Sequence, residues 1–306
     1  MRPRITIGTR GSRLARVQSG YIMEMLKAAD ADLDVAIRVI TTTGDRVLDK
    51  PLAEIGGKGL FTEELEAELR DGTIDLAVHS LKDLPTDSPA GLTVGAVPKR
   101  VTPNDALVCA KWSSLDAIDE GARVGTSSLR RKAQLLAYRS DLEIVDLRGN
   151  VDTRIGKVLD SGELDAAILA CAGLERIDRA DAIAQVLSPE IMLPAPGQGA
   201  LGIQTRADDA EVLALLQDIG DAASAAEVAA ERALLAALGG GCQVPIGALA
   251  AAGEALTLQA CVCSLDGATV LRHEAVGPCE GAEALGRKVA EVLLAEGADA
   301  IVAELA

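Results

Sequence analysis

The sequence predicts an α/β protein of three domains, in which two similar lobes joined by a hinge are followed by a small α+β domain. Strand and helix patterns alternate through about residue 200, which is typical of largely parallel sheets covered by helices. Within that stretch three short patterns recur in the same order, as a duplicated lobe requires. The 306 residues, at roughly 150 per domain, allow two or three domains.

The recurring patterns mark matching strands of the two lobes. The first is a strand, a turn of small residues and the start of a helix. The second is a strand that ends in Gly-Asp or Gly-Asn, and the third is a strand that follows a glycine. The paired copies are residues 5–15 and 123–133, 39–45 and 144–150, and 72–78 and 162–168. We therefore expect one strand arrangement built twice, with an extra stretch around 46–62 in the first lobe.

Two proline-containing segments, residues 98–104 and 188–199, mark where the chain passes between the lobes. Proline lacks an amide hydrogen and interrupts both helices and strand ladders. Two crossings also make a hinge plausible. The predicted first lobe comprises residues 1–99 and 200–218, and the predicted second lobe comprises residues 100–199.

Residues 219–306 predict the third domain. An alanine-rich helix extends from Asp221 to Leu238, with Asp221 or Ser224 as its N-cap and three glycines, 239–241, after its end. Alternating patterns then predict three strands and a final helix. Their expected positions are about 244–251, 255–263 and 269–276 for the strands and roughly 281–295 for the helix.

The charge balance limits the ligands that this chain can bind. Acidic residues outnumber basic ones 46 to 30, for a net charge of −16. Nucleic-acid and anionic-membrane binders need a net basic face, so both classes are disfavoured, and an anionic ligand needs a local basic patch. No apolar run reaches the 18 or so residues of a membrane span, and the N-terminus begins directly with a strand pattern. We expect a cytoplasmic protein whose six cysteines remain thiols.

A basic patch is predicted at the start of helices in both lobes. Ser12 and the turn Thr126-Ser127-Ser128 stand where helices begin, which is where free amides and the helix dipole favour anions. Guanidinium groups that could hold carboxylates or phosphates in a bidentate fork lie beside them or after the next strand. These are Arg10, Arg13, Arg130, Arg131, Arg148 and Arg154. Alternatively, the serines only cap their helices and the arginines are solvated. With only four aromatic residues in the chain, ligand contacts must be mostly polar.

A second candidate segment, His79–Pro85, follows the apolar strand 74–78. Lys82 and Asp83 at the end of a strand suit acid–base catalysis or stabilisation of charge. A loop of solvated charges with a capping aspartate is the alternative. Residues 56–62 lack the spacing of a phosphate-binding loop, so we interpret them as a mobile loop, in which Lys58 lies and Phe61 is either core or a lid contact.

Cys242 follows three glycines, so its thiol is expected to be accessible to a ligand. Hydrolytic thiol chemistry usually needs a histidine, and the chain has only His79 and His273. A thiol that serves once as a permanent attachment point has no such need. Cys261 and Cys263 share one face of a strand, but without a second cysteine pair the residues predict no metal site.

Together these motifs resemble the porphobilinogen deaminase (hydroxymethylbilane synthase) family, in order along nearly the whole chain. Arg13 is a departure, because many relatives have proline there. The stretches that carry the resemblance are 9–12, 56–61, 79–85, 125–131, 147–154, 172–176, 194–199 and 240–247. The resemblance implies lobes similar to those of periplasmic solute-binding proteins and a dipyrromethane cofactor bound covalently to Cys242. It also implies condensation of four porphobilinogen molecules with loss of ammonia, and hydrolytic release of the linear tetrapyrrole.

The resemblance also implies roles for individual residues. Asp83 is the catalytic residue, and Lys58 and Phe61 belong to a loop or lid. The residues expected to bind the cofactor are Asp83, Lys82, Ser80, Thr126, Ser128, Arg130, Arg131 and Arg148. Those expected to bind substrate are Arg10, Ser12, Arg148, Arg154, Arg176 and Gln198. The resemblance further leads us to expect a monomer that hands its product to uroporphyrinogen III synthase.

The alternative to this enzyme is a non-catalytic two-lobed binder or sensor of anionic small molecules. Such a protein would explain the lobes and the arginines. It would leave the glycine-rich segment around Cys242 unexplained.

Overall fold

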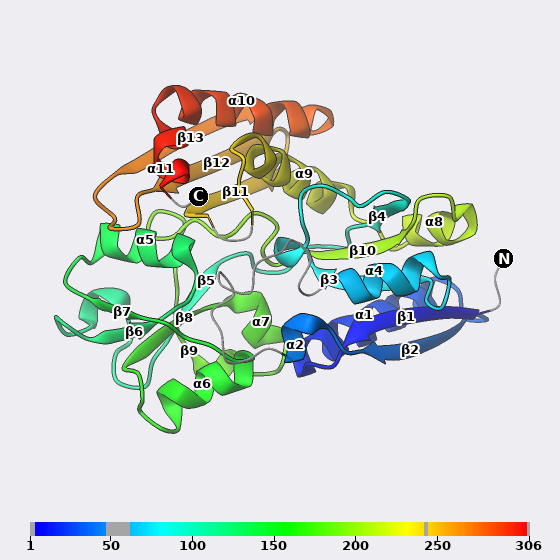
Figure 1. Cartoon of the computed structure of the whole chain (residues 1–306), viewed down its shortest axis with the longest axis horizontal. Coiled ribbons are helices and arrows are strands. Elements are labelled where there is room, and N and C mark those ends of the chain that lie inside the picture. Colours follow the sequence, from blue (N-terminus) through cyan, green and yellow to red (C-terminus); the bar gives the residue numbers. More distant parts are fainter. Residues whose placement is uncertain (1–3, 47–61, 242–243, 305–306) are drawn as a thin grey trace. The chain divides into compact units, whose positions relative to one another are not determined.

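The computed structural model describes residues 4–46, 62–241 and 244–304 (Figure 1). The expectations for Lys58, Phe61 and Cys242 therefore lie outside the described residues. By its internal contacts the chain divides into two compact units, one of residues 1–100 with 200–225 and one of residues 101–199 with 226–306. The predicted division into three domains stays a prediction.

The first unit is built on a five-stranded sheet in the order β2-β1-β3-β10-β4. Strands β2, β1 and β3 are parallel, whereas β10 is antiparallel to both of its neighbours. We call this sheet with its helices the first lobe. Its strands are β1 (Arg4–Arg10), β2 (Asp34–Ile40), β3 (Leu76–Ser80), β4 (Leu92–Ala96) and β10 (Leu201–Arg206).

Helices cover both faces of the first sheet. On one face α1 and α8 place Ile22, Leu26 and Leu216 in a core with Ile7 and Val78. On the other face α4 contributes leucines that pack with apolar side chains of the sheet and its loops. Burial of these apolar stripes is the main stabilisation of the lobe. The helices are α1 (Arg13–Ala29), α2 (Thr43–Arg46), α4 (Glu63–Arg70), the 3-10 turn η1 (Leu81–Asp83) and α8 (Ala210–Gln217).

The second unit contains a sheet of the same design, in the order β7-β6-β8-β5-β9. Strands β7, β6 and β8 are parallel, and β5 is antiparallel to β8 and β9. We call this sheet with its helices the second lobe. Its strands are β5 (Asp105–Val108), β6 (Arg123–Gly125), β7 (Glu143–Val145), β8 (Ala166–Ala170) and β9 (Ile183–Val186). Its helices are η2 (Leu115–Ala117), α5 (Leu129–Tyr138), α6 (Val151–Leu159), α7 (Cys171–Arg176) and η3 (Ala180–Ala182).

The identical strand order and directions confirm the prediction of two similar lobes, and the three repeated sequence patterns lie on matching strands. The match extends to single residues. Gly8 and Gly125 occupy the same position, and a Cβ there would lie 2.4 Å from Ile74 Cδ1 or 2.5 Å from Leu164 Cδ1. In each sheet the antiparallel strand, β10 or β5, follows directly on a crossing between the lobes.

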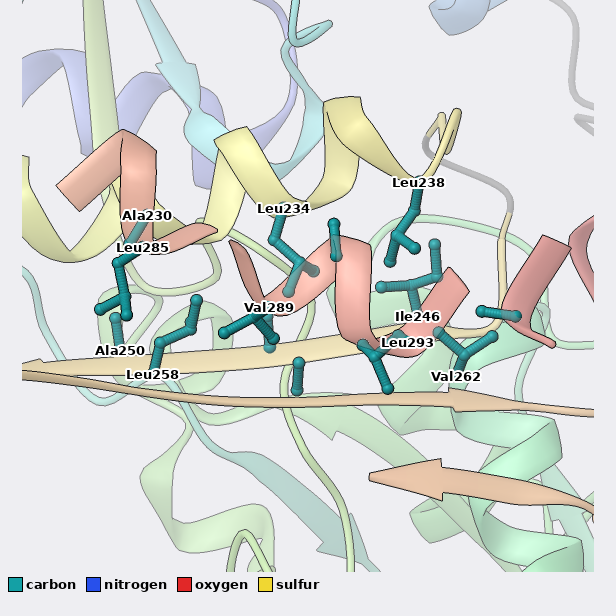
Figure 2. Packing of buried hydrophobic residues seen from close by; sticks show 14 of the residues in the cluster. Ala230, Leu234, Leu238, Ile246, Ala250, Leu258, Val262, Leu285, Val289 and Leu293 are labelled. Atoms are coloured by element: carbon teal, nitrogen blue, oxygen red, sulfur yellow. The ribbon is translucent and has the colours of Figure 1, made fainter. Parts of the chain in front are cut away.

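The C-terminal part forms an antiparallel sheet in the order β11-β12-β13, covered by α9 and α10, as predicted. Leu234 of α9, Leu238 just after that helix, and Val289 and Leu293 of α10 point toward the sheet, where they meet strand side chains such as Leu258 (Figure 2). The elements are α9 (Ala222–Ala237), β11 (Ile246–Ala252), β12 (Leu256–Cys263), β13 (Val270–Gly277), η4 (Cys279–Gly281), α10 (Ala282–Ala295) and α11 (Ala298–Ala303).

Local signals set the ends of α9. The Asp221 carboxylate accepts a hydrogen bond from the amide of Ser224 (2.8 Å), so Asp221 is the N-cap. After the helix, Gly239 has a positive φ of 68° and the amide of Gly240 donates to the carbonyl of Leu235, which satisfies an end carbonyl. In the part of the chain that the structure describes, no helix combines the length and hydropathy needed to cross a membrane.

Candidate functional site

In the first lobe, the predicted site residues lie at neighbouring strand ends. Arg10 is the last residue of β1 and Ser80 the last residue of β3, and these two strands are parallel neighbours. Ser12 caps α1, its hydroxyl accepting from the amide of Ala15 (3.3 Å). One edge of the sheet therefore carries a guanidinium, a hydroxyl and the start of a helix, as anion binding requires.

Lys82 and Asp83 form the single 3-10 turn that follows β3. Lys82 is half-buried and Asp83 is exposed. The preceding Ser80 hydroxyl accepts a hydrogen bond from Nε2 of Gln18 (2.9 Å), a buried residue of α1. Because that bond uses the Ser80 oxygen as an acceptor, the hydroxyl can in addition donate its own hydrogen. The sequence reasoning missed Gln18, whose only signal is a polar residue on the buried face of a helix.

His79 is buried in β3, and its Nε2 lies 3.0 Å from Oε1 of Gln204 on β10. An amide oxygen only accepts, so Nε2 carries the hydrogen. The pKa of His79 is lowered to about 4, chiefly by burial. The hydrogen bond to Gln204 raises the pKa, and the positive charge of Arg10 lowers it by a smaller amount. The imidazole is therefore neutral near pH 7.

In the second lobe, Thr126, Ser127 and Ser128 lie between β6 and α5, at the matching edge of its sheet. Ser128 caps α5 by accepting from the amide of Arg131 (3.4 Å), and Thr126 Oγ1 accepts from the amide of Ser128 (3.2 Å). Ser127 Oγ donates to the carbonyl of Leu147 and accepts from its amide. The turn is thereby fixed to the segment after β7, just before Arg148.

Arg130 and Arg131 are both buried, and both bind the carboxylate of Asp105. Arg131 donates from Nε and Nη2 to Oδ1 (3.0 and 2.7 Å) and from Nη1 to the carbonyl of Ile168 (2.9 Å). Arg130 donates from Nη1 to Oδ2 (2.6 Å) and to the carbonyl of Leu193 (2.8 Å). Gln198 Nε2 donates to Oδ1 as well (2.9 Å). We call Asp105, Arg130, Arg131 and Gln198 the Asp105 cluster.

The Asp105 cluster holds one negative and two positive charges away from water. Burial alone would raise the pKa of Asp105, but the charges and hydrogen bonds of Arg130 and Arg131 outweigh it and hold the pKa well below its usual range. Sequence reasoning missed Asp105. Two features could have indicated it. Asp105 directly precedes three apolar residues, Ala106–Val108, in β5, and two buried arginines require a nearby anion.

The other predicted ligands of the second lobe also contact backbone carbonyls. Arg154 Nε donates to the carbonyl of Gly149 (2.8 Å), and Arg176 Nη2 donates to that of Gly199 (2.7 Å). Gln198 Nε2 donates to the carbonyl of Pro103 (2.7 Å) in addition to Asp105. The second lobe thus brings Arg130, Arg131 and Gln198 together, whereas Arg10, Ser12, Ser80, Lys82 and Asp83 belong to the other unit. Arg13, beside them, is exposed.

These donors fit a ligand with carboxylate groups. Nε of Arg130 is fully buried and has no hydrogen-bond partner among the described residues, so it can donate to a carboxylate oxygen. Within residues 4–46, 62–241 and 244–304, no group of three or more His, Cys, Asp or Glu residues is arranged to hold a metal ion.

The duplicated sheets and the cationic strand ends define the class of a two-lobed α/β protein suited to a small polyanion. Comparison with known sequences specifies it further. Residues 5–214 match the family model "Porphobilinogen deaminase, dipyromethane cofactor binding domain", and residues 225–295 match that of the porphobilinogen deaminase C-terminal domain. The chain belongs to the porphobilinogen deaminase family.

Curated relatives agree along the full length. The porphobilinogen deaminase of Brevibacillus brevis is 50% identical over 98% of this chain and 96% of its own length. That of Roseiflexus castenholzii is 49% identical over 99% of this chain and all of its own. Among solved structures, the chain is similar to the methionine binding protein MetQ, with a TM-score of 0.46 and 17% identity over 71% of this chain and 90% of that one. The family models and the full-length curated relatives do not favour the non-catalytic alternative.

Proposed function

We propose that this chain is a hydroxymethylbilane synthase that joins four porphobilinogen molecules head to tail and then releases the linear tetrapyrrole by hydrolysis. Each joining step breaks the aminomethyl C–N bond with loss of ammonia, forms a C–C bond between the methylene carbon and the free α-carbon that attacks it, and removes the proton from that α-carbon. The observation that carries the proposal is the match of both family models over residues 5–214 and 225–295.

In this reaction the second lobe serves as the carboxylate holder. Porphobilinogen carries an acetate and a propionate, so guanidinium groups and helix-start amides are suitable donors. We assign cofactor carboxylates to Thr126, Ser128, Arg130, Arg131 and Arg148, and substrate carboxylates to Arg148, Arg154, Arg176 and Gln198. The unpartnered Nε of Arg130 supports this assignment.

The first lobe supplies acid–base and charge-stabilising groups. We assign Asp83 to stabilise the cation that forms when ammonia leaves a pyrrole, and to move protons when the amine departs and when the ring is deprotonated. Its exposed position at a strand end supports contact with a ligand. Lys82 and Ser80 would pair with cofactor carboxylates, and Arg10 and Ser12 with those of the substrate.

We assign Cys242 as the covalent attachment point of dipyrromethane, through a thioether that keeps the primer on the protein when the product leaves. When bound, dipyrromethane supplies the free α-carbon to which the first substrate ring is joined. Lys58 and Phe61, in a segment that the structure does not describe, are assigned to a loop over the site.

Measuring ammonia released per porphobilinogen consumed tests the proposed reaction. The purified chain should release one ammonia per substrate and form one tetrapyrrole per four substrates. Saturable binding of porphobilinogen without its consumption would instead support the anion-binding alternative.

We further propose a monomer that works in the cytoplasm and passes its product to uroporphyrinogen III synthase. The free thiols at Cys109, Cys171, Cys261, Cys263 and Cys279 suit a reducing compartment. Sedimentation of the purified chain tests the oligomeric state.

A further inference from the structure

The Asp105 cluster has no counterpart in the first lobe, although both lobes share one design. Asp105 pairs with Ala170 at the end of β8, and the matching residue of the first lobe is Leu201, which pairs with Ser80 at the end of β3. Counted from their N-caps, Ser128 and Ser12, Arg130 and Arg131 match Leu14 and Ala15. The first lobe therefore forms the same sheet and helix without the buried charges.

Burying three charges is unfavourable unless their attraction and hydrogen bonds compensate. The apolar residues of the first lobe show that this packing position can be filled without any charge. A role in folding alone does not explain why the second lobe has the charges.

The two arginines of the cluster differ in how many of their guanidinium nitrogens donate hydrogen bonds. Every nitrogen of the Arg131 guanidinium donates to a partner, namely Asp105 or the carbonyl of Ile168. Among the described residues, the Arg130 guanidinium makes its hydrogen bonds through Nη1 alone, and its buried Nε has no partner. The Nε side of a guanidinium is an edge that can bind a carboxylate in bidentate fashion.

We propose that Asp105 is a positioning residue, fixed by Arg131 and Gln198, that holds Arg130 through Nη1 so that the Nε edge is kept for one carboxylate of the dipyrromethane cofactor. The inference rests on the proposed function and adds a division of labour within it. Arg130 contacts the cofactor directly, whereas Arg131, which was assigned to the cofactor together with it, acts through Asp105. Pre-orienting the guanidinium reduces the side-chain freedom lost when the carboxylate binds.

The test compares Asp105→Asn with Asp75→Asn. Asp75 also accepts from an arginine, Arg206 (3.2 Å), and from the amide of Thr6, but it belongs to the framework of the first lobe. Each variant is produced without adduct in cells unable to make porphobilinogen and is then incubated with porphobilinogen. Intact mass follows the appearance of the adduct, and thermal unfolding of the adduct-free protein reports stability.

We expect Asp105→Asn to form the adduct at least tenfold more slowly than the wild type, and Asp75→Asn to form it within twofold of the wild-type rate. Once the adduct has formed, Asp105→Asn should retain it as fully as the wild type does, because the thioether is intact. The loaded variant should show a raised KM for porphobilinogen with a smaller change in kcat. An adduct rate and KM within twofold of wild type for Asp105→Asn would overturn the proposal.

A second variant covers the case in which Asp105→Asn does not fold. Arg131→Lys keeps the positive charge but loses the two-nitrogen contact with Oδ1. It should slow adduct formation at least fivefold, and a rate equal to wild type would contradict the role of Arg131. Failure of the proposed function would look different, since the wild type itself would then acquire no adduct.

Discussion

The two lobes have the same sheet but different chemistry at its edge. After β3 the first lobe continues with Leu81-Lys82-Asp83, whereas after β8 the second lobe continues with Cys171-Ala172-Gly173. Conversely, Asp105, Arg130 and Arg131 of the second lobe replace Leu201, Leu14 and Ala15 of the first. The same sheet order therefore forms with apolar side chains at these positions in one lobe and with paired charges in the other. Duplication thus provides two edges that can specialise separately, and we propose that one serves proton transfer and the other holds carboxylates.

The largest effect is expected at the Asp83 position. Asp83→Asn keeps the size of the side chain but removes its charge and basicity, so turnover should fall by about 10²- to 10⁴-fold while the adduct is retained. The measurement is ammonia release by protein whose mass confirms the adduct. Asp87→Asn, in the same loop, is the control and should stay within twofold of wild type. Near-normal turnover of Asp83→Asn would remove this residue from the reaction.

Transplanting the first-lobe residues into the second lobe separates stability from ligand binding. Removing only one partner, as in Asp105→Ala, should destabilise the fold by about 3–5 kcal/mol, since it leaves uncompensated buried charges. The triple variant Asp105→Leu, Arg130→Leu, Arg131→Ala should instead be near neutral or stabilised by about 1–4 kcal/mol. Denaturant unfolding measures both. The triple variant should also fail to acquire the adduct, and a normal adduct there would contradict the assignment of carboxylate binding to this cluster.

His79 should make the stability of the first lobe depend on pH. The unfolded chain takes up a proton near pH 6.5 but the folded chain only near 4, so the unfolded state binds more protons between these values. Stability contributed by the neutral imidazole is complete above pH 6.5 and is lost as the pH falls toward 4, by about 3 kcal/mol in all. His79→Gln should flatten this part of the stability curve, measured by urea unfolding at several pH values. If the variant loses stability between pH 6.5 and 4 as steeply as the wild type, His79 does not cause this pH dependence.

The smallest effects concern the matched glycines. Gly8→Ala and Gly125→Ala each introduce a methyl group against a buried side chain, Ile74 or Leu164. Each should destabilise the fold by about 1–3 kcal/mol, with similar values if the lobes are equivalent here. Thermal unfolding measures both. A large difference between them would weaken the comparison of the two lobes at this position.

Sequence reasoning predicted the duplicated fold because strand, turn and helix-start patterns are local and recur in order. It also predicted the helix end before Gly239 and narrowed the N-cap to Asp221 or Ser224, of which the structure shows Asp221; both signals depend on neighbouring residues only. It could not predict that Arg130 and Arg131 bind Asp105, because that contact joins residues 25 and 26 positions apart, on α5 and on β5. Gln18 and Ser80, 62 positions apart, meet for the same reason. Long-range polar contacts depend on how elements pack, and a local pattern does not contain that information.

The most direct test of the account is the intact mass of the purified chain. We predict that the wild type exceeds the mass of its unmodified sequence by two pyrrole units, and that Cys242→Ala has the unmodified mass. A wild-type chain without this adduct, and unable to acquire it when supplied with porphobilinogen, would contradict the central claim.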